Sequence, residues 1–228
     1  MTSLLENLVG VIAPHYCFVC SKENNMLCEQ CAMQFAGAEA SICFLCEKPT
    51  ADFALCRSCA AATTLQHVWP ATTYDGVVAQ VIKQYKFGRA QAASLALARL
   101  VQYTLPLLPM DTLIVPVPTA PAHVRQRGYD HTLLLAKALS RATGLGYRTL
   151  LRRTSNVRQL GATRAQRLRQ LQGDFVLTDA AACRNATILL LDDVSTTGAT
   201  LLAAASVLQT GGVGSIQAAV VARHTARK

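Results

Sequence analysis

The hydrophobic pattern divides most of the chain into short apolar runs and longer amphipathic segments. A continuous apolar run covers residues 188–191, which is typical of a strand buried on both faces. A second run covers residues 112–115, and Pro116 ends it because proline fixes φ and has no N–H to donate. Amphipathic spacing predicts helices over residues 77–87, about 129–141 and 201–210. This alternation predicts an α/β fold with a mostly parallel sheet flanked by helices.

A change in composition near residues 60–70 marks a domain boundary. The closely spaced cysteines stop there, so we predict a small domain over residues 1–62 and the α/β domain over residues 63–228. No segment approaches the roughly 20 uninterrupted apolar residues that span a membrane. The N-terminal segment carries Glu6 and has no basic leading region, so it does not resemble a secretory signal. We therefore expect a cytoplasmic protein.

Eight of the nine cysteines form four Cys-x-x-Cys pairs. Two residues between thiolates let both sulfurs face one ion, and two such pairs complete a tetrahedral zinc site. Four pairs therefore predict two structural zinc ions, which also supply folding energy to a segment with few large apolar residues. A disulfide framework is the alternative, but it suits a secreted protein. The eight predicted ligands are Cys17, Cys20, Cys28, Cys31, Cys43, Cys46, Cys56 and Cys59.

The order in which the cysteine pairs combine stays open at this point. Sequential pairing joins the first pair to the second and the third to the fourth, across connections of seven and nine residues. Interleaved pairing is also compatible with the spacing, although we favour sequential sites. In either arrangement the metal uses all the thiolates, so the sites are structural rather than catalytic.

The formal net charge of +9 is unevenly distributed. Residues 1–62 hold three Lys/Arg and six Asp/Glu, whereas the remaining residues hold nineteen and seven. The interval between Asp130 and Asp174 contains nine basic residues and no acidic one. Such a field attracts polyanions, either a pyrophosphate or nucleotide or a nucleic-acid backbone. A solvated basic face beside an anionic active site is the alternative.

The strongest chemical signal follows the apolar run at residues 188–191. In parallel α/β sheets, ligands bind beyond the carboxyl ends of the strands, where a turn and the start of a helix attract phosphate. Carboxylates there accept hydrogen bonds from two neighbouring sugar hydroxyls, or reach Mg²⁺ through water. Threonine hydroxyls add donors, and Gly198 permits a close approach of the backbone. We predict a site for a phosphorylated ribose; an ordinary strand–turn–helix with an acidic cap is the alternative. The residues in order are Asp192, Asp193, Val194, Ser195, Thr196, Thr197, Gly198, Ala199 and Thr200.

The segment ILLLDDVSTTGAT resembles the phosphoribosyl pyrophosphate motif of type I phosphoribosyltransferases. The fuller pattern resembles the ComF family, and this likeness covers nearly the whole chain. The chain departs from the family at Asp130-His131, where Asn-Gln is usual, at Ser195, where an aliphatic residue is common, and at Gln170, where Asn is usual. The matching features are the four cysteine pairs, YKFGR at 85–89, VPVP at 115–118, RQRGY at 125–129, Arg153-Thr154 with Gln159, and the acidic pair.

The resemblance implies a double zinc ribbon over residues 1–62 and a type I phosphoribosyltransferase-like domain over residues 63–228. It also implies binding of phosphoribosyl pyrophosphate together with Mg²⁺, with the acidic pair on the ribose and the threonine-glycine turn on the 5-phosphate. Surface arginines that cap a helix, and a lysine that complements a helix dipole, are the alternatives for the basic positions. The residues that the resemblance brings to the pyrophosphate are Val117, Pro118, Thr119, Arg125, Arg127 and Lys86, and the candidates for catalysis are Asp192, Asp193 and Arg127.

Residues 152–170 have no steady apolar face, and long basic segments of this kind are often mobile lids. In type I transferases a loop closes over the ligand, which would exclude water and strengthen charge contacts. The segment could instead follow a DNA backbone, although aromatic platforms for base stacking are scarce in it. The resemblance gives Arg153, Gln159, Arg164 and Arg167 as the lid residues.

Two functions from different classes fit these features. In the first, the protein is a phosphoribosyltransferase in which Mg²⁺ and arginines stabilise the departing pyrophosphate, and no segment identifies the acceptor. In the second, it is a non-catalytic adaptor for single-stranded DNA with a ribose-phosphate sensor pocket. ComF members are associated with natural competence and DNA uptake, which implies DNA-import or helicase partners at the inner face of the membrane. We predict a competence protein that retains a phosphoribosyl pyrophosphate pocket.

Overall fold

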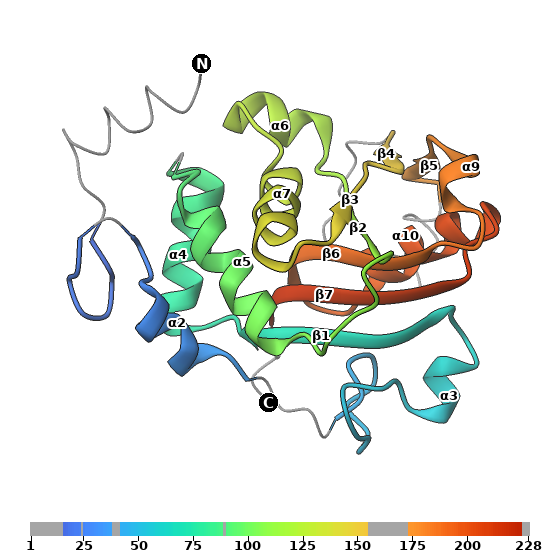
Figure 1. The fold of residues 1–228 in the computed structure, drawn as a ribbon, viewed down its shortest axis with the longest axis horizontal. Helices are drawn as coiled ribbons and strands as arrows, with labels where there is room; N and C mark the ends of the chain where they lie inside the picture. Colours follow the sequence, from blue (N-terminus) through green and yellow to red (C-terminus); the bar gives the residue numbers. More distant parts are fainter. Residues whose placement is uncertain (1–15, 24, 38–41, 89, 155–172, 225–228) are drawn as a thin grey trace, which may run out of the picture.

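A parallel sheet forms the centre of this computed structural model, which describes residues 16–23, 25–37, 42–88, 90–154 and 173–224 (Figure 1). The order β1-β7-β6-β2-β3 places the first strand beside the last, and every neighbouring pair is parallel. The predicted parallel α/β architecture is confirmed. The strands are β1 (Leu65–Thr73), β2 (Leu113–Pro116), β3 (Gly146–Tyr147), β6 (Thr187–Ser195) and β7 (Ser215–Arg223).

Helices cover both faces of this sheet. The described helices are α2 (Glu29–Phe35), α3 (Arg57–Ala60), α4 (Gly76–Phe87), α5 (Ala93–Thr104), α6 (Pro121–Arg127), α7 (His131–Thr143), α9 (Ala180–Cys183) and α10 (Ala199–Thr210). α4, α5 and α7 share one core with the sheet, and α10 packs on β6 from the other face. An antiparallel hairpin of β4 (Leu151–Arg153) and β5 (Phe175–Leu177) lies beside α10. No helix in the described part of the chain is both long and apolar enough to cross a membrane.

Strand β6 shows why a continuous apolar run suits this position. Leu189 and Leu191 belong to the core under α4, α5 and α7, while Ile188 and Leu190 belong to the core under α10. Alternate side chains of a strand point to opposite faces, so one run serves two cores. All four side chains are fully buried, and burial of each stabilises the fold by roughly 1.5–3 kcal/mol.

The prediction that β6 ends before the acidic pair is wrong. The strand runs to Ser195, because β7 continues to pair with it as far as Arg223. β2 stops earlier, with Pro116 opposite Leu191. The acidic pair therefore lies within β6, just beyond the end of β2, at the carboxyl edge of the sheet.

The two predicted helices next to the site are present with shifted bounds. α7 begins at His131 rather than near residue 129, because the carboxylate of Asp130 accepts the N–H of Leu133 at 3.2 Å and caps the helix. It ends at Gly144, whose φ of 79° stops the helix in the left-handed region. α10 begins at Ala199, two residues earlier than predicted. Both helices thus start directly at the carboxyl edge of the sheet.

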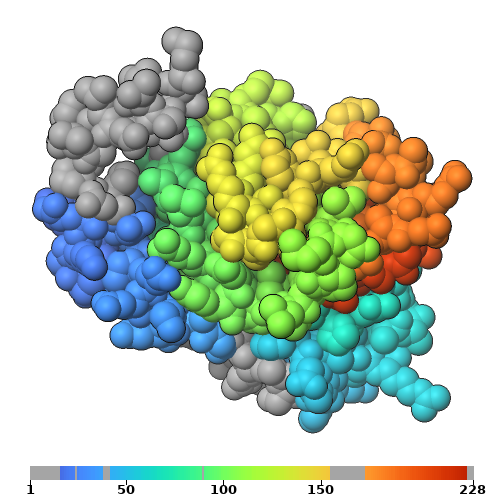
Figure 2. Space-filling model, in the orientation of Figure 1, coloured from blue at the N-terminus to red at the C-terminus, as the bar shows by residue number. Residues whose placement is uncertain are grey.

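The two cysteine-rich segments lie on opposite sides of the sheet. Cys17, Cys28 and Cys31 are buried in the core under α4, α5 and α7, where α2 packs against α5. Cys43 and Phe44 are buried instead in the core under α10. Figure 2 shows the blue and cyan segments apart on the surface, with green parts of the chain between them. Each segment therefore shares a core with the sheet, and the domain boundary at residue 62 stays a prediction.

Candidate functional site

Asp193 is the centre of a buried group of polar and charged side chains at the carboxyl edge of the sheet. Its Oδ2 lies 2.6 Å from Nζ of Lys86, in the last turn of α4. The same oxygen lies 2.7 Å from Nε2 of His131, the first residue of α7. Asp193 is 4% exposed and His131 is 5% exposed. A carboxylate this far from water requires partners, and these two side chains supply them.

The two neighbouring acids differ in protonation. Burial alone would raise the pKa of Asp193, but Lys86 and His131 outweigh it and hold that pKa well below its usual range. For Asp192, burial first and then the charge of Asp193 raise the pKa to about 8. At neutral pH one acid is therefore ionised while the other largely keeps its proton. This arrangement reduces the repulsion that an acidic pair would exert on an anionic ligand.

The turn after the acidic pair leads into the start of α10. Thr196 is exposed, and Oγ1 of Thr197 accepts the N–H of Ala199 at 3.4 Å. Gly198 adopts a φ of 74°, which glycine reaches without the strain that a Cβ brings. The first N–H groups of a helix have no partner within the helix, and its dipole favours negative charge at this end. The turn therefore offers groups that could bind an anion, and the phosphate site stays a prediction.

The second cysteine group contacts this turn. A Cβ on Gly198 would lie 2.6 Å from Cδ2 of Leu45 and 3.4 Å from Cε1 of Phe44. These two residues lie between Cys43 and Cys46, so a metal held by those cysteines fixes their position. Arg223 reinforces the contact, because its guanidinium donates to the carbonyl of Phe44 at 3.0 Å. Sequence reasoning missed this contact, since it joins segments far apart in the chain.

The loop after β2 lies beside the acidic strand. It carries Val117, Pro118 and Thr119. The N–H of Val117 donates to the carbonyl of Leu191 at 2.8 Å, which ties the loop to β6. Oγ1 of Thr119 donates to Oδ1 of Asp130 at 2.8 Å, which ties it to the start of α7. The loop is thus held between the acidic strand and the helix that carries His131.

Arg127 joins the buried group, whereas Arg125 does not. Nη1 of Arg127 lies 2.9 Å from Nδ1 of His131, and its guanidinium covers the ring of Phe87 at 5.2 Å. Its Nε is buried without a hydrogen-bond partner among the described residues. Arg125 is exposed, and no contact joins it to any described site residue. Both lie within α6, a helix that the sequence analysis did not predict.

Arg153 is the one predicted lid residue within the described ranges. It lies in β4 and pairs with Asp174 at 3.1 Å, with its guanidinium over the ring of Phe175 at 5.5 Å. Its positive charge lowers the pKa of Asp192, although burial outweighs that effect. The field of Arg153 therefore reaches the acidic pair. The other three, Gln159, Arg164 and Arg167, lie outside the described residues.

Sequence reasoning did not identify His131 as a site residue. The sequence presented it only as a departure from the ComF pattern. Its backbone is held as well as its ring, because Oη of Tyr85 donates to the carbonyl of His131 at 2.5 Å. A histidine near the predicted start of a helix, at about residue 129, was the available signal. The partner carboxylate lies on another strand, however, and a local pattern does not reveal that contact.

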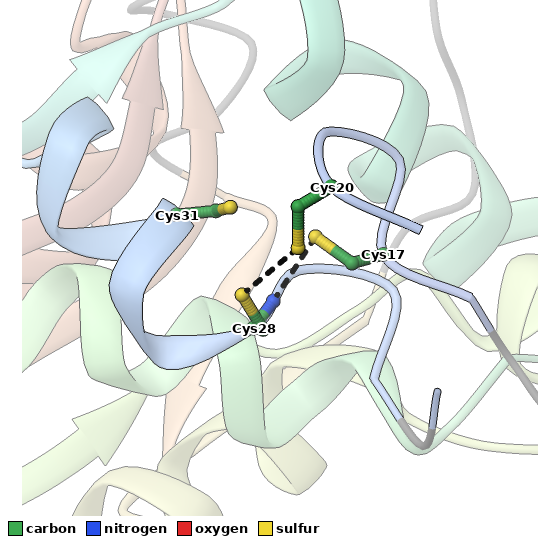
Figure 3. A group of neighbouring side chains, drawn as sticks. All are labelled: Cys17, Cys20, Cys28 and Cys31. Atoms are coloured by element: carbon green, nitrogen blue, oxygen red, sulfur yellow. Dashed lines mark hydrogen bonds between the residues drawn. The ribbon is translucent and has the colours of Figure 1, made fainter. Parts of the chain in front are cut away.

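Each cysteine group has the geometry of a zinc site (Figure 3 for the first group). Within each group the four sulfur atoms lie within 4.8 Å of one another. Four sulfurs at about 2.3 Å from a tetrahedral zinc ion lie roughly 4 Å apart, so the spacing fits that metal. The grouping is the sequential one that the sequence favoured. The groups are Cys17, Cys20, Cys28 and Cys31, and Cys43, Cys46, Cys56 and Cys59.

Two thiols of the first group differ in pKa, and the causes of this difference favour a bound metal ion. Burial alone would raise the pKa of Cys17, but backbone N–H donors, that of Cys28 first, hold the pKa at about 6. In the same group the contact with Cys28, then burial, raise the pKa of Cys31 to about 12. Thiols this close do not all ionise without a cation between them, and zinc would supply that charge.

Comparisons with known proteins agree with this geometry. Residues 133–228, which include β6, the acidic pair and α10, match the model of the phosphoribosyl transferase domain. Competence protein ComFC of Bacillus subtilis (strain 168) is 26% identical over 212 residues, which are 89% of this chain and 86% of that protein.

Similarity to solved structures is weaker. The allosteric regulatory enzyme of purine biosynthesis has a TM-score of 0.45 and 14% identity over 62% of this chain, which spans only 30% of that one. Adenine phosphoribosyltransferase from Thermoanaerobacter pseudethanolicus has a TM-score of 0.37 and 14% identity over 59% of this chain and 82% of its own. Both TM-scores are low, so neither similarity indicates a function. The chain thus has a phosphoribosyltransferase-like domain and two four-cysteine groups that fit a zinc ribbon, and it is similar to ComFC over most of its length.

Proposed function

We propose that the protein binds phosphoribosyl pyrophosphate with Mg²⁺ at the carboxyl edge of the sheet and acts on it as a phosphoribosyltransferase in a competence system. One observation carries the proposal. The acidic pair at the end of β6 leads directly into a threonine-glycine turn that opens α10, and Lys86 and Arg127 belong to the same buried group. Anion-binding and diol-binding groups thus stand next to each other, as a phosphorylated ribose requires.

The roles of the residues follow from their charges. The N–H groups and hydroxyls of residues 196–200 would bind the 5-phosphate, helped by the dipole of α10. Asp192 and Asp193 would accept hydrogen bonds from the 2- and 3-hydroxyls of the ribose. Arg127 would stabilise the pyrophosphate as it leaves C1 with the electron pair of the broken bond. Mg²⁺ would arrive bound to oxygen atoms of the ligand and neutralise part of their charge, and no residue is assigned as its direct ligand.

Handling of DNA is a second candidate, favoured by the charge distribution. Residues after 62 hold nineteen Lys/Arg against seven Asp/Glu. An excess of positive charge of this kind attracts single-stranded DNA, and the relative ComFC is a competence protein by name. In this candidate the protein is a non-catalytic adaptor for DNA-import or helicase proteins on the cytoplasmic side of the membrane. The ribose-phosphate pocket then acts as a sensor.

Calorimetry with Mg²⁺-phosphoribosyl pyrophosphate tests the site directly. We expect Asp192→Asn to weaken binding about tenfold or more, since the amide nitrogen cannot accept a hydrogen bond from a ribose hydroxyl as the carboxyl oxygen that it replaces can. Asp111→Asn is the matched control, because Asp111 is an exposed carboxylate away from the site, and it should bind like the wild type. Equal affinity of the two variants would contradict the site assignment.

Two further measurements separate the candidate functions. A screen of purine and pyrimidine bases for release of pyrophosphate supports the enzyme if any base is turned over. Titration of single-stranded DNA across a salt series supports the adaptor if binding is strong at low salt, falls with salt and survives in Asp192→Asn.

A further inference from the structure

His131 connects the two charged groups that the proposed site requires. Its Nε2 lies 2.7 Å from Oδ2 of Asp193. Its Nδ1 lies 2.9 Å from Nη1 of Arg127 and 2.9 Å from Oγ1 of Thr119. One buried ring therefore joins an acid proposed to bind the ribose to an arginine proposed to bind the pyrophosphate.

The polarity of these hydrogen bonds defines where the imidazole proton lies. A guanidinium only donates, so the contact with Nη1 of Arg127 requires a lone pair on Nδ1 of His131. The proton of the neutral ring is then on Nε2, facing the carboxylate of Asp193. In this state His131 orients the guanidinium. The buried Nε of Arg127, which has no partner among the described residues, stays available for an anion.

A second arrangement becomes available when Nδ1 takes up a proton. Oγ1 of Thr119 already donates its single proton to Oδ1 of Asp130 at 2.8 Å, so toward the ring it only accepts. A protonated His131 would therefore donate from Nδ1 to Thr119, with the carboxylate of Asp130 supporting the relay. The same proton would face the guanidinium of Arg127 and repel it. Thr119 and Arg127 thus use Nδ1 in mutually exclusive states.

We propose that His131 is a positioning residue that holds Arg127 ready for the pyrophosphate only while its Nδ1 is unprotonated, so that ligand binding depends on pH. This inference rests on the proposed function. It adds a regulation of the same site, carried by a side chain that contacts Arg127 and Asp193 rather than the ligand.

Charged groups of both signs face His131. Asp193, on β6, contacts its Nε2, and Asp130 reaches its Nδ1 through Thr119. Lys86, from α4, shares the carboxylate of Asp193, and Arg127, from α6, contacts Nδ1. Tyr85 packs its ring edge-on at 6.2 Å between ring centroids and adds no charge. The buried Asp192 has a pKa raised to about 8, so it is neutral at acidic pH and ionises near pH 8.

The test measures the affinity for Mg²⁺-phosphoribosyl pyrophosphate between about pH 5.5 and pH 8.5, the range in which histidine titrates. His131→Gln is the informative variant, because its amide donates to Asp193 and accepts from Arg127 but takes up no proton in this range. His123→Gln is the control, since His123 is half-buried on the same helix as Arg127 and has no contact with the site. Titration of the ligand phosphates and of Asp192 changes the affinity of all three proteins alike, so it cancels in the ratio of their affinities.

We expect the affinity of the wild type, divided by that of His131→Gln, to fall about tenfold from the alkaline to the acidic end, the size of one lost charge-assisted hydrogen bond. His123→Gln should follow the wild type throughout. If the ratio of the affinities of wild type and His131→Gln does not change with pH, the proposed role of His131 is overturned. Absence of binding by the wild type at every pH overturns the proposed function instead.

A ligand-free measurement decides the matter if His131→Gln does not fold. Nitrogen-15 spectra of the histidine rings in the wild type report which ring nitrogen carries the proton. At alkaline pH the resonances of His131 should show a protonated Nε2 and a bare Nδ1. A proton on Nδ1 in the alkaline sample would refute the inference, because Arg127 then has no acceptor on the ring.

Discussion

Replacing the two adjacent acids one at a time should change the stability of the fold in opposite directions. Asp193 is an ionised carboxylate held by Lys86 at 2.6 Å and by His131 at 2.7 Å. Asp193→Asn leaves the partly buried Lys86 facing a neutral amide. Breaking a fully buried pair from one side costs about 3–5 kcal/mol, so we expect a loss at the lower end of that range. The folded pKa of Asp193 lies below its unfolded value. Its stabilisation is therefore present at neutral pH and lost only as pH falls through that low value.

Asp192→Asn should have the reverse effect. Burial raises the folded pKa of Asp192 to about 8, from an ordinary value of 3.8. A group of this kind stabilises the fold fully below its unfolded pKa, and the stabilisation is lost as pH rises through the folded pKa. The wild type should therefore lose about 2–3 kcal/mol between pH 6 and pH 8, at roughly 1.4 kcal/mol for each unit. Asparagine resembles the protonated acid and does not titrate, so the variant should gain stability over the wild type as pH rises.

Urea unfolding between pH 6 and pH 9, followed by the fluorescence of Trp69, measures both effects. Trp69 is the single tryptophan and is 6% exposed in β1, so its emission reports loss of the sheet. Zinc content is checked before each series, because loss of metal would change stability by itself. The reasoning is refuted if Asp192→Asn is no more stable than the wild type at pH 9, or if Asp193→Asn is as stable as the wild type at pH 7.

Three further changes test other parts of the account. Gly198→Ala places a Cβ 2.6 Å from Leu45 at a φ of 74°, so it should lower the free energy of unfolding by about 1–3 kcal/mol; an unchanged urea midpoint would contradict this. Cys46→Ser should lose one zinc and weaken ligand binding about tenfold, because that group supports the turn. Cys20→Ser, on the opposite side of the sheet, should also lose one zinc but keep its affinity for the ligand. If the two variants lost equal amounts of zinc and equal affinity, support of the turn by the second cysteine group would be contradicted. Arg127→Ala should slow release of pyrophosphate by about 10²–10³-fold in the base screen, and an unchanged rate would remove Arg127 from the chemistry.

Features that depend on near neighbours could be predicted from the sequence. The run at residues 188–191 has an apolar side chain at every position, which is typical of a strand covered on both faces, and all four are buried. The cysteine groups follow the sequential pairing, because connections of seven and nine residues keep both pairs of a group together. The turn before α10 was predictable for the same reason, since its signals lie within a few residues of one another.

Features that depend on distant segments could not be predicted. The contact of Leu45 with Gly198 depends on how the second cysteine group lies against α10, which no periodicity encodes. The bounds of β6 depend on its pairing with β7, which continues past the acidic pair. The partners of Asp193 come from two helices that approach the strand only in the folded chain. Burial and charge pairing at this site are therefore results of packing.

A crystal structure of the protein with Mg²⁺-phosphoribosyl pyrophosphate tests the central claim most directly. The account predicts the ribose hydroxyls within hydrogen-bonding distance of Asp192 and Asp193, the 5-phosphate on residues 196–200, and the pyrophosphate near Arg127. Ligand bound elsewhere, with the turn before α10 empty and the acidic pair still closed by Lys86 and His131, would contradict it.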